Sequence, residues 1–210
     1  MKLILLSTFC VLLFVNCQGQ NINIYKKDIA GIKLEMPLNQ AMLLANKAIG
    51  FENPAGMNAD SPNLDANKLA PLLEQQGRNK YTTFNNSLDR AEFDLRNDNI
   101  KITIKGVKTG NGNECKIYEV TYKIQDDGNV ETAKNMGKKS LEKFGKPSYG
   151  QELNGRYYYG WCQEMNDNGS CKIKTASIRI SSQELIMQDL GLFQKYFDIL
   201  NKKNAQDAKF

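Results

Sequence analysis

Two cysteines and four aromatic residues lie close together in the segment RYYYGWCQEMNDNGSC, which runs from Arg156 to Cys171. Cys162 and Cys171 are nine positions apart across a turn-forming loop. Thiols of an exported chain tend to form disulfides, and closing a loop of roughly ten residues stabilises a fold by about 2.7 kcal/mol in the chain-entropy model. Catalytic dithiols usually occur as CxxC at the start of a helix. The spacing therefore predicts a structural disulfide rather than a redox or metal site.

The loop between these cysteines allows two incompatible turns. A tight hairpin turn at Asn168-Gly169 would set Cys162 opposite Thr175, too far from Cys171. A direct cross-strand pair of cysteines would instead centre the turn on Asn166-Asp167. We expect the disulfide to form, with a wider irregular loop that contains the glycine.

The aromatic residues of this segment have two interpretations. Strand alternation puts Tyr157, Tyr159 and Trp161 on one face and Tyr158 on the other. One set then fills the core while the other shields the sheet. Alternatively, the four residues form a patch that anchors a partner protein, since Tyr and Trp dominate binding hot spots.

The chain contains no histidine. This excludes Ser-His-Asp and Cys-His nucleophile systems and imidazole ligands for a metal. The acidic patches at Asp126-Asp127, 97–99 and 166–168 fall where turns are expected, and none matches a calcium-loop spacing. We therefore expect no catalytic residue, no metal and no cofactor. A hydrolase that acts on envelope glycans through carboxylates is the alternative.

The N-terminal segment predicts export. After Met1-Lys2, the apolar run from Leu3 to Val15 fits the core of a signal peptide and falls short of the roughly 20 residues that span a bilayer. Residues 1–19 are therefore expected to be a signal peptide. The expected location is the periplasm of a bacterium, or a membrane to which the protein is anchored by lipid.

The lipid anchor depends on Cys17. Residues 14–17, FVNC, resemble a bacterial lipobox, in which the cysteine is acylated, although Asn stands where Gly, Ala or Ser is usual. Ordinary cleavage after Gly19 is the alternative. If Cys17 is acylated, Cys115 is a free, buried thiol; if it is not, a Cys17–Cys115 bond becomes available. Contact with a membrane is expected only through this anchor.

The length and charge of the remaining chain indicate its domain organisation and the kinds of partner to expect. Residues 20–205 suffice for a single domain, which has room for two helix-then-strand halves at about 29–125 and 130–200, and 206–210 is expected to be a frayed tail. The net charge is +5, but acids and lysines are interspersed. Because no basic stripe is interleaved with aromatics, we expect no nucleic-acid partner.

Apolar periodicity predicts the helices. Residues 37–49 show a 3.6-residue period, with proline at the start and Gly50 just past the end. A short helix ends near Gln76, and another covers 130–144. A final helix is expected over roughly 189–203, with Asp189 as its cap. The residues expected on its inner face are Leu192, Phe193, Tyr196, Ile199 and Leu200. The segment 29–34 is a candidate short strand.

A period of two then predicts strands. A hairpin turn at 96–99 would place Leu95 opposite Ile100, Phe93 opposite Ile102, and Ala91 opposite Ile104, all on one face. A third strand would present Tyr118, Val120, Tyr122 and Ile124 to the same face, if the loop around Gly110-Asn111-Gly112 holds an odd number of residues. A last strand is expected around 185–187.

Strands in runs with helices between the runs are typical of an α+β fold. We expect an antiparallel sheet, made of the meander and the disulfide-linked hairpin, with helices packed mainly on one face. The segment GIKLEMPLNQA at 31–41 resembles the opening of small periplasmic modules of the SmpA/OmlA and β-lactamase-inhibitor-protein type, and SLEKFGKPS at 140–148 is similar to their later half. The resemblance implies helices on one face of an antiparallel sheet and binding to other proteins.

The expected function is binding without catalysis. An exported, histidine-free α+β domain without a catalytic motif fits a protein that binds another envelope or secreted protein, in the manner of an inhibitor or an immunity factor. A purely structural role as an envelope lipoprotein is a third hypothesis.

Overall fold

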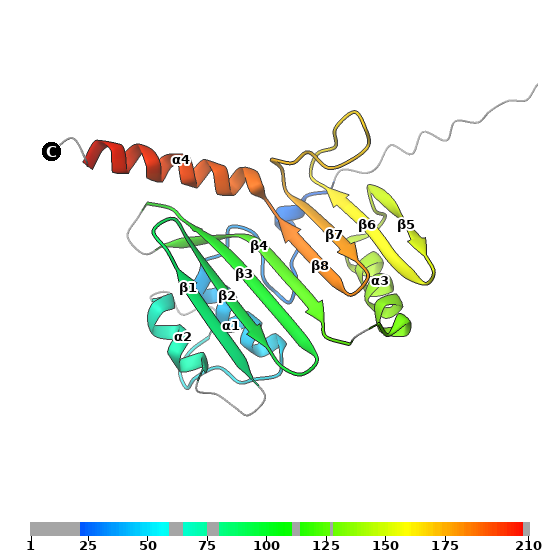
Figure 1. Cartoon of the computed structure of the whole chain (residues 1–210), viewed down its shortest axis with the longest axis horizontal. Coiled ribbons are helices and arrows are strands. Elements are labelled where there is room, and N and C mark those ends of the chain that lie inside the picture. Colours follow the sequence, from blue (N-terminus) through cyan, green and yellow to red (C-terminus); the bar gives the residue numbers. More distant parts are fainter. Residues whose placement is uncertain (1–21, 59–64, 75–79, 111–113, 127, 208–210) are drawn as a thin grey trace, which may run out of the picture.

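Eight β-strands form one antiparallel sheet, and helices lie against it (Figure 1). The computed structural model describes residues 22–58, 65–74, 80–110, 114–126 and 128–207. The elements, in chain order, are the 3-10 helix η1 (Ile24–Lys26), α1 (Leu38–Ala48), α2 (Ala66–Glu74), β1 (Tyr81–Asn86), β2 (Arg90–Arg96), β3 (Ile100–Lys108), β4 (Cys115–Ile124), α3 (Val130–Phe144), β5 (Tyr149–Leu153), β6 (Arg156–Cys162), β7 (Ser177–Ser181), β8 (Glu184–Gln188) and α4 (Leu190–Asp207).

The strands form two four-stranded meanders that join edge to edge. The order across the sheet is β1-β2-β3-β4-β8-β7-β6-β5, and β4 pairs antiparallel with β8 at the junction. Helices α1 and α2 precede the first meander along the chain, and α3 precedes the second. The α+β fold with an antiparallel sheet is confirmed. The expected halves, 29–125 and 130–200, each contain one meander, but the two meanders share one continuous sheet.

Helices α1, α2 and α3 cover one face of this sheet and enclose the main core (Figure 1). Strand alternation presents the apolar side chains of β2, β3, β4, β6, β7 and β8 to this face. Helix α4 packs on the opposite face, over the ends of β3 and β4. Its Leu192 joins Val107 and Tyr118 in a small separate cluster there. Helices therefore lie mainly on one face, as predicted, with α4 as the exception.

The β2–β3 hairpin forms, but its register differs from the prediction by two residues. Leu95 pairs with Ile102 and Phe93 with Ile104. The Asn97 side chain accepts hydrogen bonds from the backbone N–H groups of Asn99 and Ile100 and thereby tightens the turn. A shift of two residues keeps every side chain on its predicted face, so the core composition is unchanged.

A β-bulge in β4 overturns one prediction. Lys105 pairs with Glu119, but Gly106 pairs with Ile117, so Tyr118 is an extra residue in β4. The bulge turns Tyr118 toward α4 instead of toward the face of Val120. It also places Cys115 on the core face, whereas uninterrupted alternation from Val120 would put it on the opposite face.

Most helix predictions are confirmed, and one strand prediction is wrong. Helices α1 and α3 match their predicted spans within a residue, and Asp189 caps α4 by accepting from the backbone N–H groups of Gly191 and Leu192. The segment 29–34 is a tight turn closed by Ile29 and Ile32, not a strand. Strand β1 was not predicted, because its alternation is dominated by polar residues.

Candidate functional site

Among the described residues, α4 is the helix that packs on the sheet face opposite α1–α3, and it covers only part of that face. Strand register aligns one residue from each strand across it: Thr83, Asp94, Thr103, Thr121, Ile186, Arg179, Gly160 and Tyr149. Charged residues flank this middle row, namely Glu92, Lys105 and Glu119 on one side, and Arg96, Lys101, Lys123 and Glu184 on the other, where Tyr158 also lies. We call these three rows the open sheet face.

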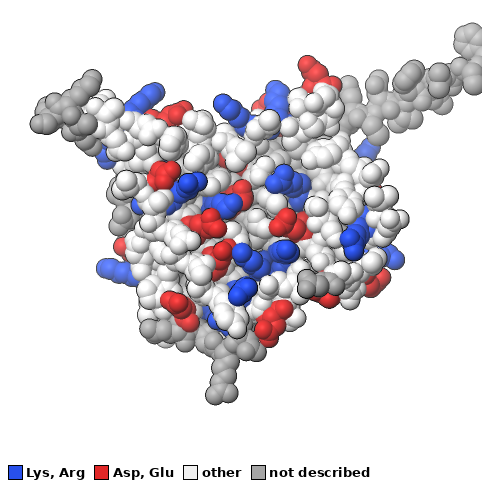
Figure 2. Space-filling view, in the orientation of Figure 1, with Lys and Arg blue, Asp and Glu red and all other residues white. Residues whose placement is uncertain are grey.

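Acidic and basic side chains are interspersed over the open sheet face (Figure 2). Lys105 Nζ lies 2.8 Å from Glu119 Oε1, and Lys101 Nζ lies 3.4 Å from Asp94 Oδ2. Although burial lowers the pKa of Lys105, the hydrogen bond and charge of Glu119 outweigh it and raise the pKa. Pairs this exposed contribute about 0–1 kcal/mol each. They therefore add little to the stability of the fold and leave a mixed pattern of charge on this surface.

The four aromatic residues of β6 divide as alternation predicts. Trp161 is fully buried and Tyr157 nearly so, while Tyr159 is partly buried against the same core. The Trp161 ring meets Phe144 of α3 edge to face at 5.3 Å, and its Nε1 donates a hydrogen bond of 2.9 Å to the Gly145 carbonyl. These three side chains pack in the core. Tyr158 alone belongs to the open sheet face.

The close approach of α3 to β6 depends on a glycine. A Cβ atom at Gly137 would lie 2.1 Å from the Tyr157 ring. Such a separation is not possible between real atoms, so an alanine here would displace the helix or the ring. Gly137 therefore sets the distance between α3 and the sheet.

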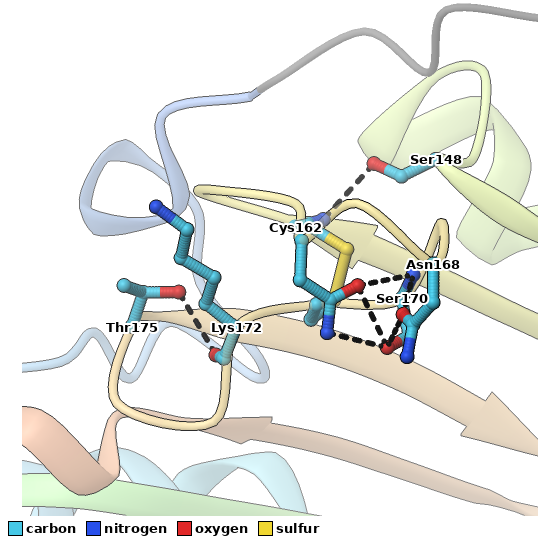
Figure 3. The surroundings of a disulfide bond; sticks show 8 residues. Ser148, Cys162, Asn168, Ser170, Lys172 and Thr175 are labelled. Carbon is cyan, nitrogen blue, oxygen red and sulfur yellow. Dashed lines mark hydrogen bonds between the residues drawn. A yellow bond between two sulfur atoms is a disulfide. The ribbon is translucent and has the colours of Figure 1, made fainter.

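The predicted disulfide between Cys162 and Cys171 is present (Figure 3). Cys162 ends β6 and pairs in register with Ser177, whereas Cys171 lies in the long loop that leads to β7. Their Cα atoms are 5.1 Å apart. Ser148 fixes the same point, because its Oγ accepts a hydrogen bond of 3.0 Å from the Cys162 N–H. The bond therefore pins the loop back onto the end of β6.

The turn inside this loop matches neither predicted position. The Asn166 N–H closes the turn by donating a hydrogen bond of 2.9 Å to the Ser170 carbonyl, and three residues lie between the two. Gly169 has φ of +79°, the left-handed conformation that a three-residue turn needs. The turn therefore centres on Asn168, within the wider irregular loop that the disulfide was expected to need.

The first described residues dock beside this loop. The Ile22 N–H donates to the Cys162 carbonyl at 3.2 Å, and the Ile24 N–H donates to Gln163 Oε1 at 2.9 Å. The Tyr25 hydroxyl donates to Asp189, and burial, followed by this bond and the carboxylate charge, raises the pKa of Tyr25. The first described residues, 22–24, therefore lie beside the disulfide.

A groove of about 400 Å³ lies on the helix-covered face, where the two halves meet. Its lining includes the apolar or aromatic side chains of Tyr122, Met136 and Leu185 and the charged side chains of Asp28 and Lys143. Burial raises the pKa of Asp28, but this is outweighed by the hydrogen bond from Lys143, 2.7 Å away, by the hydrogen bond from the Gly31 N–H, and by the charges of Lys143 and Lys33, so the pKa is lowered. The groove has the size of a small-molecule site. No local sequence pattern marks this groove, because its lining residues come together only through the β4–β8 junction.

Lys80 is buried where α1, α2 and β1 meet. Its Nζ donates to Asn46 Oδ1 at 2.6 Å and to the Leu73 carbonyl, and lies 5.1 Å from the centre of the Phe51 ring. Burial lowers the pKa of Lys80 from 10.5 to about 8. These contacts are neutral acceptors and a π face, which hold an ammonium group without a paired carboxylate.

We expect the stability difference between the wild type and Lys80→Met to depend on pH. Between pH 8 and 10.5 the unfolded state keeps the Lys80 proton and the folded state releases it, so this residue's contribution to stability rises with pH, by up to about 1 kcal/mol per unit. Urea unfolding of both proteins at each pH measures it. Burial raises the pKa of Cys115 to about 12, which makes stability fall as the pH rises. Both proteins contain Cys115, so the difference between them is free of this contribution. Parallel pH curves for the two proteins would contradict the prediction.

Comparisons with protein-family models, with curated proteins and with solved structures find no match for this chain. Function is therefore inferred from the geometry. The resemblance to modules of the SmpA/OmlA and β-lactamase-inhibitor-protein type remains a prediction.

Three further sequence predictions concern cysteines and metal. Cys17 lies outside the described residues. Within the described part of the chain, Cys115 is a buried free thiol, and no group of three or more Cys, Asp or Glu side chains is arranged to hold a metal ion. Among the same residues, no helix has the length and apolar character needed to cross a bilayer.

Proposed function

We propose that this chain is an exported bacterial protein, held at a membrane by a lipid on Cys17, that binds another envelope or secreted protein without catalysing a reaction. The observation that carries this proposal is the open sheet face. It crosses all eight strands, and both halves of the chain contribute to it. The resemblance to inhibitor-type modules supports the same class of function.

The chemistry of the open sheet face supports a protein partner. Half of its middle row is small, with Thr83, Thr103, Thr121 and Gly160 between the flanking charged rows. A Cβ at Gly160 would lie 2.2 Å from the Tyr149 ring, so this tyrosine lies across the row at one end. A flat polar surface with an aromatic edge fits a protein interface better than it fits a small-molecule pocket.

The groove gives less support to a carboxylate hydrolase. Two carboxyl groups are needed, one of which stays protonated as the acid. Asp28 is the one carboxylate among the described lining residues, and Lys143 holds its pKa below the usual range. A carboxyl group that stays ionised does not serve as a proton donor near neutral pH.

Affinity capture from envelope extract tests the proposal, with Arg179→Glu as the variant. Arg179 is exposed in the middle row, so reversing its charge should abolish recovery of a partner that the wild type retains. Lys138→Glu is the matched control, because this exposed lysine lies on α3, behind the sheet. Equal recovery by all three proteins would refute the assignment of the open sheet face. Intact mass of the mature protein tests acylation of Cys17 separately.

A further inference from the structure

The disulfide loop presents an apolar side chain between two lysines. Ile173 is 77% exposed, and Lys172 and Lys174 flank it. Two bonds hold the loop in place (Figure 3): the disulfide from Cys171 to Cys162 of β6, and a hydrogen bond of 3.0 Å that Thr175 Oγ1 donates to the Lys172 carbonyl. The isoleucine is thus kept in water by a fixed backbone.

More lysines surround the point where the chain enters the domain. Lys26, Lys27 and Lys146 line a shallow hollow together with Ile22 and Gly145. Two acids lie close to segment 22–27: Asp28, which pairs with Lys143 at 2.7 Å, and Asp189, which accepts a hydrogen bond from Tyr25. The disulfide loop beside this segment contributes two lysines and two acids, Glu164 and Asp167, of which Glu164 pairs with Lys172 at 2.9 Å. This end of the molecule therefore carries an excess of positive charge around an exposed apolar residue.

The reach of the lipid anchor limits where this end can lie. This step rests on the proposed acylation of Cys17. Ile22, whose N–H is bonded to the Cys162 carbonyl, lies five positions after Cys17. Even fully extended, a chain spans at most about 18 Å over five positions. The disulfide end would therefore stay close to the bilayer surface in every orientation that the tether permits.

We propose that the disulfide end is a second membrane contact, in which Lys26, Lys27, Lys146, Lys172 and Lys174 bind the phosphates of anionic phospholipids and Ile173 enters the interface. Lysines near the surface of an anionic bilayer are attracted to it, and an acyl chain anchors more firmly with a basic patch as a second signal. This contact also fixes an orientation. Because β6 ends at the disulfide, the strands extend away from the bilayer and leave the open sheet face accessible to a partner.

Tryptophan fluorescence of the mature protein, produced from the full chain and reconstituted into phosphatidylglycerol vesicles, tests this contact. The natural Trp161 is fully buried and gives a constant background. In Ile173→Trp, the emission of the new indole should shift to shorter wavelength on membrane binding, and brominated phosphatidylglycerol should quench it. Leu153→Trp is the matched control, since Leu153 is also exposed but lies at the opposite end of the β5–β6 hairpin. Its emission should not change.

The outcomes separate this contact from the anchor. Quenching of Ile173→Trp alone, reduced by Lys172→Glu with Lys174→Glu, supports the contact. Equal quenching at both positions, or at neither, in protein whose mass shows acylation overturns it and leaves the proposed anchor intact. If the mass shows no acyl group, the anchor fails; the contact is then also overturned unless the unacylated protein shows the same position-specific quenching.

Discussion

Trp161→Ala is expected to lower the free energy of unfolding by about 3–5 kcal/mol, the usual cost of removing a large buried aromatic residue. Trp161 is 0% exposed, contacts Phe144 of α3, and donates a hydrogen bond to Gly145 at the end of that helix. The substitution removes the apolar contacts of the indole ring and its hydrogen bond to Gly145. Urea unfolding followed by far-ultraviolet circular dichroism measures the change.

Tyr158→Ala is the matched control for this prediction. Tyr158 lies three positions earlier on the same strand and faces the open sheet face, where it is half-buried. Its removal should cost about 1 kcal/mol or less. If the two substitutions destabilise the protein equally, the assignment of Trp161 to the core and of Tyr158 to the surface is wrong.

Replacing both Cys162 and Cys171 with alanine is expected to lower the free energy of unfolding by about 2.7 kcal/mol through the larger entropy of the unfolded chain. Cys162 is 0% exposed, so the lost sulfur adds a smaller packing cost. The change should also loosen the first described residues, because Ile22 is bonded to the Cys162 carbonyl. Urea unfolding, with amide exchange at Ile22 and Ile24, measures both effects.

Reductant provides the control for the disulfide. The wild type should lose a similar stability when reduced, and the double variant should not respond. Cys115→Ala separates the bond from thiol effects, because Cys115 is buried and unbonded, so this variant should keep the full response to reductant. A double variant that remains sensitive to reductant would contradict the assigned pairing.

Local sequence signals predicted the helices and the partners of the disulfide. The structure shows why α3 keeps its predicted bounds: the Asn129 side chain caps it by accepting from the Glu131 and Thr132 N–H groups, and Gly145 ends it with φ of +80°. Such signals act within one turn of the chain, so they can be read without knowing the fold. The β2–β3 register was missed by two residues, because both registers bury the same face and only the Asn97 turn distinguishes them.

The candidate site could be predicted less well. Alternation correctly divided Trp161 from Tyr158, but it could not tell which set faces the core. The bulge at Tyr118 reverses alternation within β4, and period-two reasoning has no means of locating an extra residue. The open sheet face and the groove both need the β4–β8 pairing, which joins residues about 65 positions apart.

The sequence by itself determined the fold class, the bounds of α1 and α3 to within a residue, the Cys162–Cys171 bond and the absence of histidine chemistry, because each depends on residue identity or on contacts close along the chain. Tertiary structure alone decided that two meanders share one sheet, that α4 packs on the opposite face, and that Ile22 enters beside the disulfide. These features depend on pairings between distant segments, whose free energy comes from burial and register across the sheet, and no local pattern encodes them.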